Sequence, residues 1–78
     1  MVNIGSQFKI KNNINLLRTE KGLTQQALAD AVAVTRATIN AMEKGAYNPS
    51  LELAFRLARF FDVDIHSIFF VEDRDEDL

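Results

Sequence analysis

Residues 24–45 constrain the fold of this 78-residue chain more than any other stretch. They predict two short helices joined by a tight turn, with Thr24 and Thr35 available as N-cap residues. Ala29 is small at the position where the second helix must cross the first, and a larger side chain would push the helices apart. Val34 is an apolar residue in a turn, which is explained if it fills the junction between the helices. The stretch therefore predicts two closely packed helices with one polar face left open.

The open face belongs to the second helix of this pair. Ile39 and Met42 form its inward side. The remaining side presents short or polar residues to solvent, namely Arg36, Ala37, Thr38, Asn40, Ala41 and Lys44. A short helix with such a surface suits the major groove of duplex DNA, where side chains contact the edges of bases. Residues 25–44 therefore predict a helix-turn-helix motif.

Five helices are expected in the whole chain, which gives an all-α fold class. Each expected start has a capping side chain, supplied in turn by Asn12 or Asn13, Thr24, Thr35, Ser50 and Asp64. Gly22 and Gly45 suit the left-handed positions that end the first and third helices. The fifth helix is short and is expected to run from Asp64 to about Ile68.

The two ends of the chain differ from this helical middle. Residues 7–11 alternate polar and apolar side chains, and residues 67–72 form a short β-prone run. The two segments could pair as a small two-stranded sheet, or they could be a frayed N-terminus and a helix end. The expected organisation is an N-terminal arm or short strand over 1–11, a DNA-binding domain over 12–70 and an acidic tail over 71–78.

Charge and composition limit the kind of protein this can be. The net charge is -2, but residues 72–77 hold five of the eleven acidic residues, so residues 1–70 carry eight Lys and Arg against six Asp and Glu. This net charge of +2 permits binding to DNA. With 47% hydrophobic residues the chain can bury a core, and without cysteine it has no disulfide. No apolar run approaches the roughly 20 residues that span a bilayer, so a soluble cytoplasmic protein without a membrane partner is expected.

Metal binding and catalysis have little support in the sequence. His66 is the only histidine, and its spacing from Asp62 and Asp64 could suggest a metal site. A helix cap and an exposed histidine explain these three residues better, because no second cluster completes a site. Residues 73–77 lack the central glycine and the distal glutamate of a calcium loop. Without cysteine, a second histidine or a glycine-rich phosphate loop, no enzyme activity, metal, cofactor or small-molecule ligand is expected.

From about Asn13 to Phe69 the sequence resembles the Cro and phage-repressor (Xre-like) helix-turn-helix family. The resemblance is carried by Leu17-Arg18, Gly22-Leu23-Thr24-Gln25, Leu28-Ala29, Val34-Thr35-Arg36, Thr38-Ile39, Met42-Glu43-Lys44-Gly45 and Asn48-Pro49-Ser50-Leu51. It implies a five-helix repressor-type domain that binds double-stranded DNA as a transcriptional regulator.

The resemblance also implies roles for the residues that match the family pattern. The residues implied to read DNA bases are Arg36, Asn40, Thr35 and Ala37, with Arg36 as the first candidate for a bidentate contact to guanine. The residues implied to contact the DNA backbone are Gln25, Thr38, Lys44, Tyr47 and Asn48. Arg18 and Glu43 match a structural ion pair between the first and third helices.

This chain departs from the family pattern in the turn between the two motif helices. The family usually has glycine there, and this chain has Ala33. A residue other than glycine at positive φ costs about 1 kcal/mol, so the turn is weakened and not abolished. Ala37 and Ala41 also stand where longer polar side chains often read bases, so these two positions leave the recognition sequence undefined.

Aromatic residues near the C-terminus suggest a second interaction surface. Five of the six phenylalanines lie between residues 55 and 70, more than a core of this size needs. The contact expected for a symmetric homodimer comprises Phe55, Phe60, Phe70 and Ile68. Such a dimer would act as a repressor on a palindromic operator. The alternative is an antitoxin-like or anti-repressor-like module, whose main role is to bind another protein.

Overall fold

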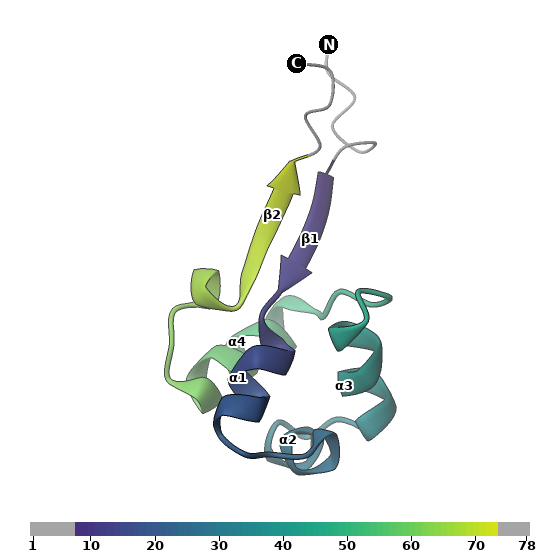
Figure 1. The fold of residues 1–78 in the computed structure, drawn as a ribbon, viewed down its shortest axis with the longest axis vertical. Coiled ribbons are helices and arrows are strands. Elements are labelled where there is room, and N and C mark those ends of the chain that lie inside the picture. The colour runs from purple at the N-terminus through teal and green to yellow at the C-terminus, as the bar shows by residue number, and fades with distance from the viewer. Residues whose placement is uncertain (1–7, 74–78) are drawn as a thin grey trace.

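A computed structural model describes residues 8–73 of the chain (Figure 1). In chain order the elements are strand β1 (Phe8–Asn12), helices α1 (Ile14–Glu20), α2 (Gln25–Ala31), α3 (Arg36–Glu43) and α4 (Leu51–Phe61), the 3-10 helix η2 (Ile65–Ser67) and strand β2 (Phe69–Asp73). The four α-helices gather into one cluster, and the two strands extend from it side by side as an arm (Figure 1). The residues expected at the two extreme ends, 1–7 and 74–78, lie outside the described part of the chain.

Four α-helices are present in residues 8–73, so the expected five-helix, all-α fold is corrected to a mostly helical fold with a small sheet. The segment expected as a fifth helix is a single 3-10 turn, in which the N–H groups of Ser67 and Ile68 donate to the carbonyls of Asp64 and Ile65 at 2.8 and 3.0 Å. Asp64 has the extended backbone of a cap residue, but its side chain makes no cap hydrogen bond. A full α-helical turn does not fit because β2 begins at Phe69.

The sheet confirms that the two end segments pair. Strands β1 and β2 are antiparallel, with Phe8 opposite Asp73 and Asn12 opposite Phe69. At the base of the arm, the N–H of Asn13 donates to the carbonyl of Ile68 at 2.8 Å. The alternative of a frayed N-terminus is therefore wrong. The expected limits of the domain at residues 12 and 70 fall inside the strands, so residues 8–11 and 71–73 belong to the sheet.

Three of the expected helix caps are present. The hydroxyl oxygens of Thr24, Thr35 and Ser50 accept hydrogen bonds from the N–H three residues further on, at 3.0, 3.2 and 3.2 Å. Each such cap stabilises a helix by about 1 kcal/mol. Helix α1 starts differently, because the side chain of Asn13 makes no cap bond and Asn12 Oδ1 accepts from the N–H of Ile14 at 3.1 Å.

The turn between α2 and α3 has the geometry that the sequence predicts. Ala33 has a φ of 63°, in the left-handed region that favours glycine. The next residue, Val34, donates its N–H to the carbonyl of Ala29 at 3.0 Å, and its side chain packs against the core. The turn therefore tolerates alanine while keeping the close crossing of the two helices.

The core draws on all four α-helices and on Ile68, which lies between η2 and β2. Its buried members are Ile14, Leu28, Ala29, Val32, Ile39, Met42, Leu53, Leu57, Ala58, Phe61 and Ile68. Ala29 has no exposed surface, as expected where α2 meets α3. No helix within residues 8–73 is long and apolar enough to cross a membrane.

Candidate nucleic-acid interface

Helix α3 has one buried face and one face that is largely open to solvent. Ile39 and Met42 are buried beneath it. Arg36 and Ala37 are exposed on the other side, and Asn40 is half-buried at its margin. Helix α3 makes its most extensive helix contact with α2, so the position of this outward face is set by the α2–α3 packing.

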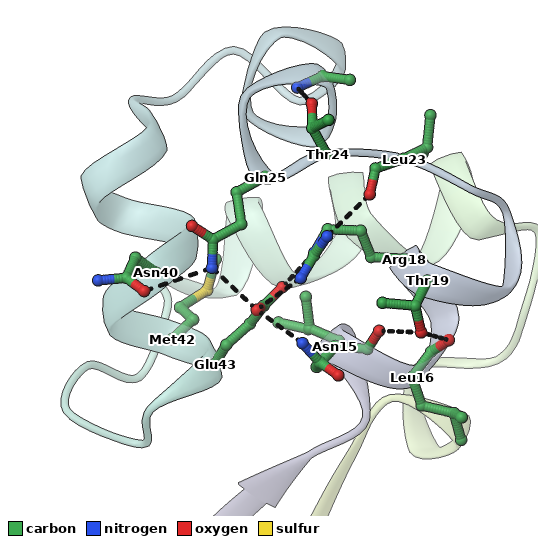
Figure 2. Close-up of polar contacts among 12 residues, drawn as sticks. Asn15, Leu16, Arg18, Thr19, Leu23, Thr24, Gln25, Asn40, Met42 and Glu43 are labelled. Carbon is green, nitrogen blue, oxygen red and sulfur yellow. Dashed lines mark hydrogen bonds and ion pairs between the residues drawn. The ribbon is translucent and has the colours of Figure 1, made fainter.

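The expected ion pair between α1 and α3 is present and mostly buried (Figure 2). Arg18 Nε lies 2.6 Å from Glu43 Oε2, and Arg18 Nη2 lies 3.1 Å from Glu43 Oε1. The two side chains are only 12% and 7% exposed. Arg18 Nη1 also donates to the carbonyl of Leu23 at 2.8 Å. The guanidinium therefore joins α1, the segment before α2 and the C-terminal end of α3, with two parallel bonds to one carboxylate.

Glu43 accepts two further hydrogen bonds, which the sequence did not indicate. Asn15 Nδ2 and Gln25 Nε2 donate to Glu43 Oε1 at 3.1 and 3.0 Å. Burial alone would raise the pKa of Glu43, but the hydrogen bonds from Arg18, Asn15 and Gln25, with the charge of Arg18, outweigh it and lower the pKa. Glu43 is therefore ionised at neutral pH and acts only as a hydrogen-bond acceptor.

The side chain of Gln25 is used inside the protein. Besides its bond to Glu43, Gln25 Nε2 donates to Asn40 Oδ1 at 3.3 Å (Figure 2). Both amide hydrogens are thus directed at protein acceptors, whereas a DNA phosphate offers only acceptors and needs a donor. The expected contact from the Gln25 side chain to the DNA backbone would therefore have to break one of these bonds. Its main-chain N–H, among the first of α2, has no carbonyl partner within the helix.

The other residues expected to read bases lie at the N-terminal end of α3. Arg36 makes no hydrogen bond or ion pair with any residue between 8 and 73, so its guanidinium is available to a ligand. Thr35 Oγ1 accepts the N–H of Thr38 and lies 3.0 Å from Thr38 Oγ1, so both hydroxyls belong to the helix cap. Ala37 is exposed beside Arg36.

The remaining backbone-contact candidates follow α3. Lys44, Tyr47 and Asn48 are all exposed. Lys44 also lines a polar hollow of about 140 Å³ together with Lys9 and Lys11 of β1. No pattern in the sequence separates these two lysines from ordinary surface residues, because only the pairing of the strands brings β1 beside the end of α3.

The residues expected at a dimer contact do not form one patch. Ile68 is 0% exposed and belongs to the core, so its assignment to a dimer surface is corrected. Phe60 is half-buried and packs against the core, with its ring 5.2 Å from that of Phe61 in an edge-to-face arrangement. Phe70 and Phe55 are 43% and 52% exposed and border two different hollows, which have Ile65 in common.

We use the term apolar hollow for the concavity of about 480 Å³ that Phe70 borders. Its lining residues are Ile10, Asn48, Pro49, Leu51, Ala54, Ile65, His66, Phe69, Phe70 and Val71. Leu51 is 72% exposed there. His66 is exposed, and the described residues contain no group of three His, Cys, Asp or Glu placed to hold a metal ion.

Helix α2 packs across α3 and leaves the outer face of α3 exposed. This α2–turn–α3 unit defines a helix-turn-helix DNA-binding domain. A family model of helix-turn-helix proteins matches residues 14–68, and the chain belongs to this Xre/Cro-like family of non-enzymatic transcriptional regulators.

Known proteins similar to this chain support the same assignment. An HTH-type transcriptional regulator of Methanocaldococcus jannaschii is 50% identical over 64 residues, which cover 82% of this chain and 97% of that protein. The crystal structure of the restriction-modification controller protein C.AhdI from Aeromonas hydrophila has a TM-score of 0.65 at 33% identity, covering 70% of this chain and 80% of that one. The biofilm regulator SinR, solved in complex with DNA, has a TM-score of 0.65 at 27% identity, covering 70% and 89%.

Proposed function

We propose that this protein binds specific sequences of double-stranded DNA by inserting the outward face of α3 into the major groove. The observation that carries the proposal is the guanidinium of Arg36, which makes no hydrogen bond or ion pair within residues 8–73 and lies on the exposed side of a helix whose other side is anchored by Ile39 and Met42. A guanidinium in this position matches the two acceptors of guanine, O6 and N7. The similarity to SinR, a protein solved with DNA, supports this reading.

The DNA backbone is proposed to bind beside α3. Lys44 is exposed at the end of the helix, and Tyr47 and Asn48 are exposed in the loop that follows. These groups would fix the register of the protein on DNA without reading its sequence.

A homodimer is proposed because one protomer offers a small reading surface. The eight residues of α3 span about 12 Å, which is roughly the rise of three to four base pairs. Two copies related by a two-fold axis would place their α3 helices about 34 Å apart and read a palindrome. The apolar hollow, with Leu51 and Phe70 exposed at its border, is the surface proposed for the contact between copies.

We propose repression as the outcome, because a dimer seated on an operator that overlaps a promoter excludes the polymerase. The test is selection of bound duplexes from a random pool, followed by a reporter that carries the selected site. Recovery of a palindrome with half-sites one helical turn apart, and reduced reporter output when the protein is expressed, are expected. A pool without enrichment would refute specific binding. Co-purification of a different protein in fixed ratio would favour the antitoxin-like alternative.

A further inference from the structure

We infer that Asn40 contacts the base edge only as a hydrogen-bond donor, and that Gln25 imposes this restriction from the neighbouring helix. The inference rests on the proposed function and deepens it, because it assigns the chemical pattern that one position of the DNA site must present. Asn40 would select guanine and reject adenine, although a free asparagine side chain pairs well with adenine.

The orientation of these amides begins at Glu43. Its carboxylate is held by two bonds from the guanidinium of Arg18 and is mostly buried. An ionised carboxylate accepts hydrogen bonds and has no hydrogen to donate. Any amide group that faces Glu43 must therefore turn its nitrogen toward it.

Gln25 is one of two amides that face Glu43, the other being Asn15, and it is the one that also reaches α3 at Asn40. The 3.0 Å contact between Gln25 and Glu43 Oε1 requires the NH₂ group at this position, since the amide oxygen would meet a carboxylate oxygen. An exposed glutamine can be drawn with its amide oxygen and nitrogen in either position. At Gln25 the negative charge of Glu43 decides which of the two atoms faces it. The second hydrogen of the same NH₂ group is left for a different acceptor.

Asn40 provides that acceptor. The atom of Asn40 that lies 3.3 Å from Gln25 Nε2 must be Oδ1, because two NH₂ groups would repel at this distance. The NH₂ group of Asn40 then lies on the side away from Gln25, as Figure 2 shows. The chain from Glu43 through Gln25 to Asn40 therefore fixes a donor on the outward margin of α3.

The four bases differ in how well their major-groove edges can bond to the NH₂ group of Asn40. Guanine offers two acceptors, O6 and N7, which the NH₂ group of Asn40 can contact. The paired contact to adenine needs an amide oxygen turned toward N6–H as well as a donor for N7, and the oxygen of Asn40 is turned toward Gln25 and away from the outward side. Cytosine presents an N4–H donor, which finds no acceptor.

The experiment compares selected DNA sites for the wild type, Asn40→Ala, Gln25→Met and Gln26→Met. Asn40→Ala identifies the base position that Asn40 contacts, because preference there is lost. Gln25→Met keeps the length of the side chain but removes its amide, which frees Asn40 to turn. Gln26 is the matched control: it is the next residue of α2, also a glutamine, but it is exposed and bonds to Asp30 at 2.9 Å.

The wild type is expected to prefer guanine over adenine at the Asn40 position by roughly tenfold or more. Gln25→Met should raise the adenine share several-fold at that position alone, whereas Gln26→Met should leave it unchanged. Adenine in the wild-type site, an unchanged ratio in Gln25→Met, or no position affected by Asn40→Ala would each overturn the inference. Specific binding persists in all three of these results, whereas failure of the proposed function would appear as no selected sequence at all.

A measurement without DNA tests the orientation itself. In the free protein, NMR exchange rates of the side-chain NH₂ groups are expected to be slower for Gln25 than for Asn40 and Gln26. Equal exchange at Gln25 and Gln26 would show that the bonds of Gln25 to Glu43 and Asn40 are absent in solution, and would overturn the inference independently.

Discussion

At the level of single residues, the site depends on one mostly buried carboxylate of α3 that accepts hydrogen bonds from side chains of α1 and α2. Glu43 accepts hydrogen bonds from Arg18, Asn15 and Gln25, so a single acidic residue at the end of α3 fixes how that helix sits against α1 and α2. Arg36, at the other end of the helix, takes part in none of these bonds and is exposed. The residue that holds α3 against α1 and α2 and the residue proposed to contact a base therefore lie at opposite ends of α3. Variants can test the two roles one at a time.

Arg36→Ala is expected to weaken binding to the selected site by about 1–3 kcal/mol and to remove discrimination at one base position. The matched variant Lys44→Ala should weaken binding to all sequences similarly and lower the salt slope by roughly 1 per protomer. Titrations by fluorescence anisotropy at several salt concentrations measure both effects. Unchanged affinity and preference in Arg36→Ala would contradict the role assigned to α3.

Ala33→Gly is expected to stabilise the fold. Ala33 has a φ of 63°, where the Cβ atom is strained and glycine is not. The greater freedom of glycine in the unfolded chain offsets part of this gain, so the net increase should reach some tenths to about 1 kcal/mol. Urea denaturation measures it, with Ala46→Gly as the control. A loss of stability in Ala33→Gly would show that the strain of alanine in this turn is negligible.

The stability contributed by Glu43 should depend on pH. Its pKa is lowered in the folded state, so the unfolded chain takes up this proton at a higher pH than the folded protein does. The contribution is fully present above the unfolded pKa of about 4.3 and is lost as the pH falls through the lower folded pKa. Denaturation curves between pH 7 and pH 3 should show a smaller acid-dependent loss in Glu43→Gln. The exposed Glu52→Gln should retain the loss seen in the wild type.

At the level of helices and strands, what the sequence predicts well is local. The caps at Thr24, Thr35 and Ser50 and the left-handed turn at Ala33 depend on a few neighbouring residues, and each is confirmed. The expected fifth helix failed because pairing of β2 with β1 overrides the helical preference of residues 64–68.

The network around Glu43 was only partly predictable for the same reason. The ion pair with Arg18 followed from a resemblance, whereas the bonds from Asn15 and Gln25 arise from the way three helices meet. Phe60 and Ile68 were assigned to a surface because the number of aromatic and apolar residues near the C-terminus does not show which of them are buried. In the structure both pack in or against the core.

The cap of α4 gives a prediction at this level. Ser50→Ala removes the hydroxyl that accepts the N–H of Leu53, so the free energy of unfolding should fall by about 1 kcal/mol. Ser67→Ala is the control, since its hydroxyl makes no hydrogen bond within the part of the chain that the structure describes. Equal effects of the two substitutions on urea denaturation would contradict the capping role.

At the level of the whole molecule, the outward face of α3 and the apolar hollow are built from different parts of the chain. The hollow combines residues of β1, β2 and the start of α4, so it exists only because the two ends of the chain pair. A change in the hollow can therefore alter assembly without touching Arg36 or its neighbours.

Phe70→Asp is expected to produce folded monomers with much weaker binding to a palindromic site, because it places a charge at the border of the apolar hollow. Phe55→Asp is the matched control, since Phe55 is also an exposed phenylalanine but borders a different hollow. Analytical ultracentrifugation at tens of micromolar measures the mass, and circular dichroism measures the fold. A wild type that sediments as a monomer without DNA would refute the homodimer.

The pairing of Phe8 with Asp73 brings the beginning and the end of the described chain together, so the backbone almost forms a ring. A short peptide could join these positions while new termini are opened at Lys21 and Gly22, which are both exposed between α1 and α2. Such a circular permutant should keep every helix in place, because the cut falls between α1 and α2 and the entropic cost of closing a loop grows only slowly with the length of the loop. The fold of this protein then depends on how its helices and strands pack, and not on the order in which the gene encodes them.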